Sequence, residues 1–372
     1  MHKIGLIINP VAGIGGKVGL KGSDGAETQR RALCLGAKPE SNNKAKTMLE
    51  ELLPVREEVE ILTYPGEMGE DAAKACRLNC EVFGAIRAGE TTPADTAQAA
   101  RDLAEAGAEI VLFAGGDGTA RNILDAIGTS IPVLGIPAGC KIHSAVYALN
   151  PKRAGELVVK YVCGGIKEYR DAEVMDIDED LFRQDIVQAR LYGYLRIPAE
   201  RALVQNMKSG RGASEHVLAA QMAQYMADTM EPDTLYIIGP GSTTRGIMEK
   251  LGLKNTLLGV DLVYNSGLLE NDATEGDILF ALDKYSNARI IVTVIGGQGY
   301  VFGRGNQQIS ANVIRRVGKE NIMIVASRDK MLSLMGTSLY VDTGDEEINK
   351  TMCGYYKITT GYEDYIMFKV IC

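Results

Sequence analysis

The sequence predicts an α/β fold in which an N-terminal open, doubly wound parallel sheet is joined to a second, strand-rich α+β domain. In the first half, short apolar runs alternate with amphipathic stretches, as in a parallel sheet covered by helices. Past Asn150-Pro151 this alternation loosens into strand-like runs with polar breaks. The 372 residues are enough for two cores. We therefore expect domains at residues 1–145 and 146–372, with a ligand site in the cleft between them.

The expected elements follow from this periodicity, and each early strand leads into a Gly- or Pro-containing loop, where open α/β sheets bind ligands. In the first domain the expected strands are Ile4–Ile8, Val59–Thr63, Ile110–Phe113 and Pro132–Ile136, and the expected helices are Lys44–Leu53, Gly69–Asn79, Pro93–Ala106 and Arg121–Ile127. In the second domain we expect strands at Val174–Ile177, Asp185–Tyr194, Ala202–Gln205, Leu235–Ile238, Leu257–Tyr264, Ala288–Ile295, Ile322–Ala326 and Tyr365–Val370, and a helix at Arg245–Leu251.

The composition and charge of the chain exclude several classes of function. A formal net charge of −8 gives no broad positive field, so nucleic acid is not an expected partner. No run approaches the ~18 apolar residues of a membrane helix, and the apolar run Ile4–Ile8 is too short for a signal peptide. Seven cysteines without CxxC spacing favour a reducing cytoplasm. Cys76 and Cys80 have helical spacing but lack further ligands, so we expect no metal there.

The strongest chemical signal is the turn Gly115-Gly116-Asp117-Gly118-Thr119, which joins a buried strand to a helix. Glycines let a phosphate approach the backbone, and a helix N-terminus supplies N–H groups and partial positive charge. Asp117 would repel phosphate, but it could hold Mg²⁺ or accept the proton of an attacking hydroxyl. The alternative is a structural turn with Asp117 as helix cap. The candidates here are Asp117 as catalytic base and Gly115, Gly116, Gly118, Thr119 and Asn122 for phosphate binding.

Lys141, His143 and Ser144 follow the next expected strand and should reach the same edge of the sheet. A lysine there could neutralise phosphate oxygens, and a histidine could donate to a phosphate or a ribose hydroxyl. Equally, Lys141 could be solvated and His143 could begin a helix. Both interpretations stay open at this point.

Three further glycine-rich loops follow expected strands and are candidate nucleotide-binding loops. A flexible linker, a plain helix cap at Ser242 or Thr243, and a bent hairpin whose Arg304 packs on a neighbour are the respective alternatives. The candidate residues are Asn9, Pro10, Gly13, Gly15, Gly16 and Lys17 in the first loop, Gly241, Ser242, Thr243, Thr244 and Arg245 in the second, and Gly297, Gln298, Arg304 and Asn306 in the third.

The Gly115–Thr119 turn resembles the signature of the superfamily that joins NAD kinases, diacylglycerol kinases and sphingosine kinases. Asn9–Gly13 is similar to the strand-one turn of those kinases, and Asp233–Thr244 resembles an NAD-kinase segment. The loops Asn9–Gly25, Pro137–Ser144 and Gly296–Asn306 are similar to a prokaryotic branch of polyphosphate- or ATP-dependent NAD kinases, which includes a protein encoded beside acetoin-breakdown genes.

The resemblance implies transfer of a phosphoryl group from ATP or polyphosphate, with Mg²⁺, to the ribose hydroxyl of NAD, giving NADP, with Asp117 as general base. It also implies a homo-oligomer, since related kinases often assemble. The chain lacks the Asn-Glu pair with which the wider NAD kinases grip the acceptor, and Pro137–Lys141 replaces a Gly-Thr-Gly-Asn-type loop. A kinase of another small hydroxylated metabolite and a non-catalytic nucleotide-binding protein therefore stand as alternatives.

Overall fold

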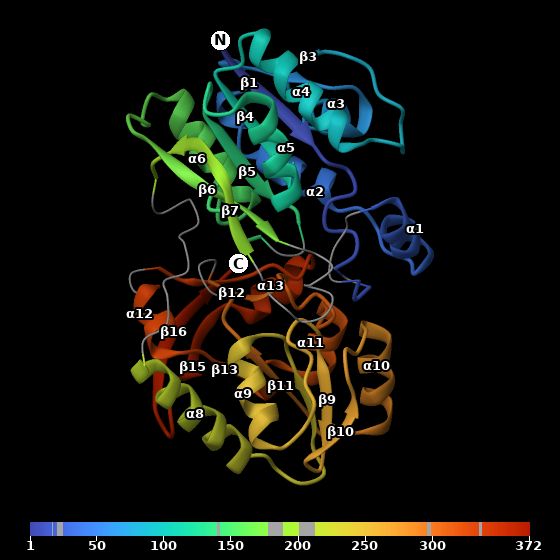
Figure 1. Ribbon diagram of the computed structural model, residues 1–372, viewed down its shortest axis with the longest axis vertical. Coiled ribbons are helices and arrows are strands. Elements are labelled where there is room, and N and C mark those ends of the chain that lie inside the picture. The colour runs from blue at the N-terminus through green and yellow to red at the C-terminus, as the bar shows by residue number, and fades with distance from the viewer. Residues whose placement is uncertain are drawn as a thin grey trace. The chain divides into compact units, whose positions relative to one another are not determined.

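A computed structural model describes residues 1–16, 18–20, 25–139, 142–177, 189–200, 213–295, 299–334 and 337–372. The chain forms two compact units, which are described separately (Figure 1). The first unit consists of Met1–Gly15 and Gly22–Met207, and the second of Gly16–Lys21 and Lys208–Cys372. The short stretch Gly16–Lys21 thus groups with the later part of the chain rather than with its sequence neighbours.

The first unit is built on a parallel sheet of five strands in the order β3-β2-β1-β4-β5. Because β2 and β3 extend the sheet from β1 in one direction and β4 and β5 in the other, its topological switch point lies between β1 and β4. The strands are β1 (His2–Ile8), β2 (Val59–Thr63), β3 (Cys80–Val82), β4 (Ile110–Gly115) and β5 (Val133–Pro137). The helices are α1 (Ala26–Cys34), α2 (Ser41–Glu50), α3 (Glu70–Ala75), α4 (Pro93–Glu105), α5 (Asp117–Ile127) and α6 (Pro151–Val162).

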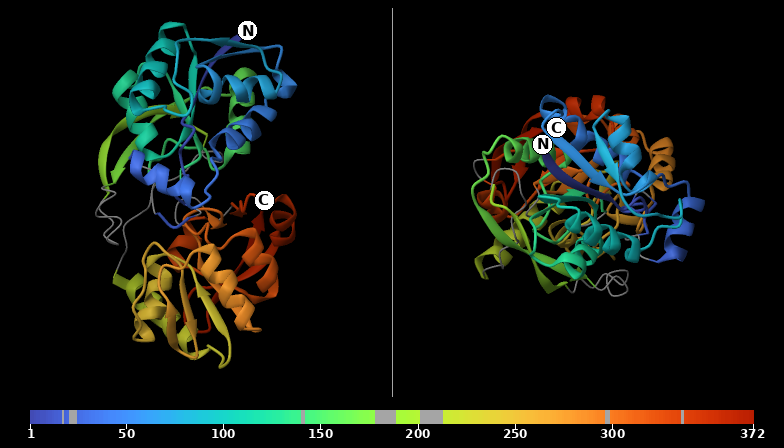
Figure 2. Two further views of the ribbon diagram at one scale, coloured as in Figure 1. Left: turned by 90° about the vertical axis from the view of Figure 1, so that its right-hand side faces the viewer. Right: turned by 90° about the horizontal axis from the view of Figure 1, so that it is seen from above.

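Helices cover both faces of this sheet (Figure 2). Helix α2 packs on α6, β4 and β5, whereas α4 packs on α5, β1 and β4. Every residue of β4 is buried, which explains why the strand is an uninterrupted apolar run rather than an alternating one. The predicted parallel sheet is confirmed.

The first unit extends beyond the predicted boundary at residue 145. Helix α6 and the antiparallel strands β6 (Tyr169–Ile177) and β7 (Ala189–Pro198) belong to it. Leu157, Val174 and Leu195 from these elements enter its hydrophobic core. The apolar faces of α6 and of the β6–β7 pair cover sheet and helix surface that would otherwise be exposed, so the expected division of the chain at residue 145 is corrected.

The second unit has a nine-stranded mixed sheet in the order β10-β9-β8-β11-β13-β15-β16-β14-β12, of which β8, β11, β13 and β15 run parallel. Its strands are β8 (Leu235–Ile238), β9 (Asp261–Tyr264), β10 (Gly267–Glu270), β11 (Ala288–Thr293), β12 (Tyr300–Phe302), β13 (Ile322–Val325), β14 (Leu339–Val341), β15 (Gly354–Thr359) and β16 (Tyr365–Ile371). Its helices are α8 (Ala213–Asp228), α9 (Ser242–Lys250), α10 (Glu275–Lys284), α11 (Ala311–Val317), α12 (Arg328–Ser333) and α13 (Glu346–Met352).

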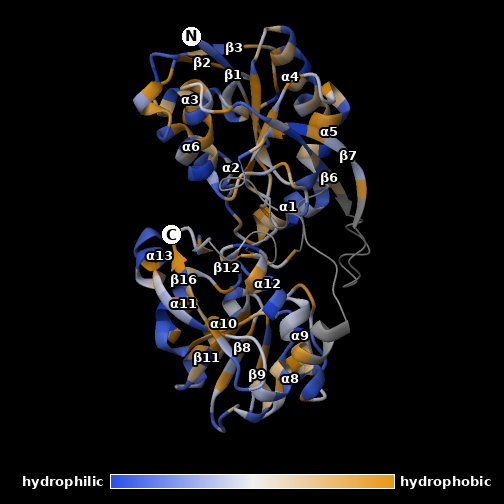
Figure 3. Ribbon diagram, turned by 90° about the vertical axis from the view of Figure 1, so that its left-hand side faces the viewer, coloured by the Kyte–Doolittle hydropathy of each residue, from blue (hydrophilic) through white to orange (hydrophobic). Residues whose placement is uncertain are grey.

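Two apolar clusters hold this second sheet between layers of helices. One joins residues of α8 and α9 to β8, β9, β11 and β13, and the other joins residues of α10, α11 and α13 to the strands. Hydrophobic segments accordingly concentrate along the strands, while the helices carry many hydrophilic segments (Figure 3). The prediction of a strand-rich second domain is confirmed.

Some local expectations differ from the structure. Cys76 and Cys80 do not share a helix, because Cys76 is the C-cap of α3 and Cys80 begins β3. Between them Arg77 adopts a left-handed conformation with φ 56°, which ends the helix. The strand expected at Ala202–Gln205 and the first part of the one expected at Asp185–Tyr194 lie outside the described residues.

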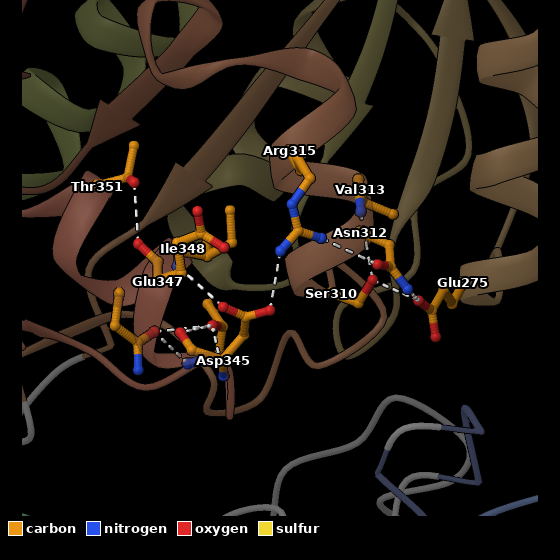
Figure 4. Close-up of polar contacts among 11 residues, drawn as sticks. Glu275, Ser310, Asn312, Val313, Arg315, Asp345, Glu347, Ile348 and Thr351 are labelled. Carbon is orange, nitrogen blue, oxygen red and sulfur yellow. Dashed lines mark hydrogen bonds and ion pairs between the residues drawn. The ribbon is translucent and has the colours of Figure 1, made fainter.

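A polar network links the N-termini of α10 and α13 to residues of α11 in the second unit (Figure 4). Ser310 caps α11 and donates its hydroxyl to Glu275 at the start of α10. Arg315 of α11 donates to Asp345 over 2.9 Å and to Asn312 over 3.2 Å. Asp345 also caps α13 by accepting from the backbone N–H of Ile348 at 3.0 Å. The Ile348 N–H and the Arg315 guanidinium together lower the pKa of Asp345 from its ordinary value.

Candidate functional site

The candidate site lies where β1, β4 and β5 end at one edge of the first sheet. Ile8 pairs with Ala114, and Gly115 pairs with Pro137, so the turns that follow the three strands emerge side by side. Since β1 and β4 flank the switch point, this edge is where an open α/β sheet offers room for a ligand.

Asn9 joins the turn after β1 to the start of α5. Its backbone N–H donates to Ala114 O at 2.9 Å, and its side-chain Nδ2 donates to Thr119 Oγ1 at 3.0 Å. Its Oδ1 accepts from the backbone N–H of Val11 at 3.3 Å. Asn9 therefore acts as a fixed bridge between two of the three turns.

Close backbone contact between the turns accounts for their glycines. A Cβ on Gly139 would lie 2.7 Å from Gly116 Cα, and one on Gly115 would lie 2.3 Å from Thr119 Oγ1. A Cβ on Gly13 would lie 2.2 Å from Ala138 O, and Gly13 also has a φ of 75°, which favours glycine. The three turns are thus packed into one rigid edge.

Asp117 is the first residue of α5, and its carboxylate faces the segment that follows β5. Its Oδ2 accepts from the backbone N–H of His143 at 2.8 Å, and its Oδ1 accepts from that of Ser144 at 3.0 Å. The His143 ring lies alongside, with Nδ1 3.4 Å from Oδ2. Asp117 does not cap its own helix, since Gly116 occupies the cap position without a side-chain bond.

The Asp117 carboxylate keeps the capacity to bind another group. Its side chain is 13% exposed and that of His143 is 19% exposed. An ionised carboxylate offers about four lone-pair sites, and the two backbone N–H groups occupy one on each oxygen. As the first residue of α5, Asp117 also lies at the positive end of the helix dipole. The arrangement combines a fixed carboxylate with a helix N-terminus that favours anions.

The other predicted residues of the first unit lie on or near this edge. Ser144 accepts, through its Oγ, the backbone N–H of Met175 at 2.9 Å. Asn122 lies half-buried on α5, one turn beyond Gly118, while Pro10 and Gly15 are buried in the loop after β1. Lys17 and Lys141 are outside the described residues, and Gly16 groups with the second unit.

Tyr147 is a residue of this edge that the sequence did not indicate. Its side chain is fully buried, and its hydroxyl donates to Gly116 O at 2.5 Å. Nothing in the spacing around Tyr147 distinguishes it from an ordinary apolar residue, so only the fold identifies it.

The second-unit loop Gly241–Arg245 begins α9. Gly241 has a φ of 132° and stands at the cap position, and Thr244 Oγ1 donates back to Gly241 O at 2.9 Å. Ser242 is exposed, Thr243 is buried, and Arg245 donates to Glu249 at 2.7 Å along the same helix. Gly241 rather than Ser242 or Thr243 thus occupies the cap position.

In the loop after β12, the polar side chains contact the loop itself and the adjoining strand. Asn306 Nδ2 donates to Val301 O at 2.8 Å, and its Oδ1 accepts from Gly303 N–H at 3.2 Å. Arg304 is buried with its guanidinium carbon 4.6 Å from the centre of the Tyr300 ring. Both side chains therefore support the loop in this structure. Gly297 and Gln298 fall outside the described residues.

The described part of the chain contains neither a cluster of metal ligands nor a membrane-spanning helix. No three His, Cys, Asp or Glu side chains there form a group that could hold a metal ion. None of the helices among these residues combines the length and the apolar character needed to cross a membrane.

Two family models match the chain. Residues 4–166 match the model of the ATP-NAD kinase N-terminal domain, and residues 232–370 match that of the ATP-NAD kinase C-terminal domain. No curated protein matches the chain. A crystal structure of a candidate diacylglycerol kinase from Bacillus anthracis matches with 16% identity and a TM-score of 0.24, over 48% of this chain and 43% of that one.

The two family matches fall in order along the chain. The first covers the sheet that carries Asp117, and the second covers nearly all of the nine-stranded sheet. The chain is therefore a member of the ATP-NAD kinase family, whose members are phosphotransferases.

Proposed function

We propose that this protein transfers a phosphoryl group from ATP or polyphosphate to a ribose hydroxyl of NAD, with Asp117 as general base. The observation that carries the proposal is the Asp117 carboxylate, which two backbone N–H groups fix at the N-terminus of α5 and which has more lone pairs than these two bonds use. Membership of the ATP-NAD kinase family supports a phosphotransferase, and the donor and acceptor named here go beyond that membership.

The Asp117 carboxylate can orient and deprotonate the acceptor hydroxyl. Phosphoryl transfer needs a hydroxyl oriented in line with the leaving group, and a carboxylate within hydrogen-bond reach can orient that hydroxyl and accept its proton. The His143 and Ser144 N–H groups hold the carboxylate in one orientation. Such fixation reduces the reorganisation needed at the moment of transfer.

Backbone N–H groups near the start of α5 would bind the phosphates of the donor. Gly116 and Gly118 leave this turn without bulky side chains, and the helix N-terminus adds partial positive charge. His143 would donate to a phosphate oxygen, and Lys141, which lies outside the described residues, would neutralise phosphate charge. In the second unit, considered by itself, the loops at Gly241–Arg245 and at Arg304 and Asn306 are proposed nucleotide-binding loops.

Mg²⁺ fits this arrangement, although the described residues offer it few protein ligands. Protein-bound Mg²⁺ typically takes one or two carboxylates and fills its remaining positions with phosphate oxygens and water. With Asp117 assigned to the acceptor hydroxyl, phosphate oxygens of the donor and water would supply the ligands of the ion. When bound, the ion would neutralise charge on the transferred group.

The proposal is tested by incubating the full chain with NAD, Mg²⁺ and either ATP or polyphosphate, and measuring NADP. We expect wild type to form NADP and Asp117→Asn to lose about 10²–10⁴-fold in rate, the usual contribution of a general base. Asp125→Asn is the matched control, because Asp125 lies on the same helix and accepts from the Tyr192 hydroxyl at 2.9 Å. Its activity should stay near wild type.

Three other results would contradict parts of the proposal. Equal NADP formation by wild type and Asp117→Asn would exclude Asp117 as the base. Consumption of ATP only with some other hydroxylated metabolite would exclude NAD as the acceptor. Because the Asn-Glu pair is missing, other hydroxylated metabolites should be screened as acceptors. Nucleotide binding without any product, unchanged by Asp117→Asn, would point to a non-catalytic binding protein. Thermal melting of each variant separates lost chemistry from lost folding.

A further inference from the structure

We infer that Tyr147 is a positioning residue, which fixes the peptide that carries Asp117 and thereby sets the direction of the base and of its backbone N–H. This inference rests on the proposed function for its kinetic consequence, and on geometry for the placement itself. Tyr147 reaches the reacting edge from the segment after β5, outside the glycine turn that carries the chemical signature.

Packing contacts fix the position of the Tyr147 ring independently of the hydrogen bond that its hydroxyl makes. The Val146 carbonyl accepts from Gly135 N–H at 2.9 Å, and Ala148 N–H donates to Gly135 O at 2.9 Å, so the segment runs along β5 like a short added strand. A Cβ on Gly135 would lie 2.3 Å from Tyr147 Cδ1, and the Phe113 ring meets the Tyr147 ring edge-on with centroids 5.3 Å apart. Gly135 therefore leaves the space that the ring fills.

The seated ring directs the hydroxyl to the Gly116 carbonyl. Tyr147 Oη donates to Gly116 O at 2.5 Å, and the same carbonyl accepts from Thr119 N–H at 2.9 Å and Ala120 N–H at 3.1 Å. Among the described residues, three donors thus converge on the carbonyl that precedes Asp117. Two of them belong to the first turn of α5, and the third, Tyr147, lies outside the helix.

The fixed carbonyl determines where the Asp117 backbone points. The peptide that joins Gly116 to Asp117 is planar and trans, so its N–H points opposite to its C=O. With Gly116 O held toward Tyr147 and the helix, the Asp117 N–H faces away from both. This peptide also sets the starting direction of the Asp117 side chain. Tyr147 therefore holds the base from the backbone side, while His143 and Ser144 hold its carboxylate.

The test is Tyr147→Phe, which keeps the ring, its seat over Gly135 and its contact with Phe113, and removes only the hydroxyl. For NADP formation we expect kcat to fall about tenfold with little change in the KM for NAD, since the loss concerns alignment of the base. Tyr161→Phe is the matched control, because that hydroxyl contacts Glu109 at 3.5 Å rather than the glycine turn. Its kcat and KM should match wild type.

Hydrogen exchange on the ligand-free protein provides a second readout that needs no activity. In Tyr147→Phe, the amides of Thr119 and Ala120, which share the Gly116 carbonyl, should exchange faster than in wild type and in Tyr161→Phe. Wild-type exchange together with wild-type kcat in Tyr147→Phe would overturn the inference. A second variant is needed if Tyr147→Phe melts well below wild type. Gly135→Ala displaces the ring but keeps the hydroxyl, and it should give the same loss in kcat. An unchanged kcat in Gly135→Ala would overturn the inference.

The two proposals fail in different ways. If wild type forms NADP and Tyr147→Phe matches it, the positioning role falls while the proposed function stands. If wild type forms no NADP, the proposed function falls, and the exchange of Thr119 and Ala120 alone decides whether Tyr147 fixes the turn.

Discussion

Asp117 illustrates how one residue can support a local structure and still be available for chemistry. Each of its oxygens accepts one backbone N–H, from His143 or from Ser144, so the carboxylate pins the segment after β5 to the start of α5. Because the remaining lone pairs are unoccupied by these bonds, the structural role does not exclude a catalytic one. Substitution of Asp117 is therefore expected to affect both stability and activity, and the two must be measured separately.

Gly13 is expected to be intolerant of any side chain. Gly13→Ala combines a φ of 75° with a Cβ 2.2 Å from Ala138 O, so it should lower the free energy of unfolding by about 2–3 kcal/mol. Gly107→Ala is the control, because Gly107 follows α4 with a φ of 88° but has no atom within 4 Å of the added Cβ. It should cost only about 1 kcal/mol. Chemical denaturation measures both, and equal losses would show that the turns after β1 and β5 are not rigidly packed.

At the residue scale, the sequence predicted candidate site residues from the chemistry of their side chains. The turn Gly115–Thr119 was expected to lie with Asn9 and His143 at one sheet edge, and the structure brings these residues together. Tyr147 was not foreseeable, because its role depends on the space above Gly135 and on a bond to a carbonyl 31 residues away. Such contacts depend on strand register, which a single sequence does not show.

At the scale of elements, the strands of the first sheet were predictable and many short helices were not. Buried parallel strands are continuous apolar runs, so β1, β2, β4 and β5 were readily found. Helices α11 and α13 have 7 residues each, which is two turns and too few for a clear amphipathic period. They begin instead at side-chain caps, Ser310 and Asp345, whose effect depends on local geometry.

Asp345 should make the second unit sensitive to acid. The Ile348 N–H and Arg315 lower its pKa in the folded state from the ordinary value of 3.8, so its contribution is complete above that value and is lost as the pH falls through the lower folded pKa. Asp345→Asn should therefore lower the Tm at pH 7 and lower it less below pH 4. Melting curves between pH 3 and 7 measure this, and Asp283→Asn is the control, because Asp283 pairs with Arg316 without capping a helix. An equal loss at every pH would contradict the prediction.

At the scale of the whole molecule, the two units have separate hydrophobic cores. Leu134→Ala, in fully buried β5, should destabilise the first unit by about 2–5 kcal/mol. Hydrogen exchange should then rise in β1, β4 and β5 and change little in β11 and β13. Leu262 is buried in β9 of the second unit, so Leu262→Ala is the complementary control. It should raise exchange in β11 and β13 and change it little in β1, β4 and β5. A uniform rise across both sheets in either variant would contradict separate stabilisation.

The division into two domains was predictable from length and from the change in periodicity, but its position was not. Nothing in the sequence of α6, β6 and β7 shows which core their apolar faces join, because that depends on the space left around α5 and β5. Gly16–Lys21, which belongs with the second unit, was expected in the first domain for the same reason.

The placement of Gly16–Lys21 has a consequence for protein synthesis. The ribosome makes this stretch well before the rest of its unit, Lys208–Cys372. Nascent domains generally fold in order from the N-terminus, so this early stretch must wait for its partners until those later residues have been made. For the same reason, a gene split after codon 207 would encode two pieces of which the second lacks part of its own unit.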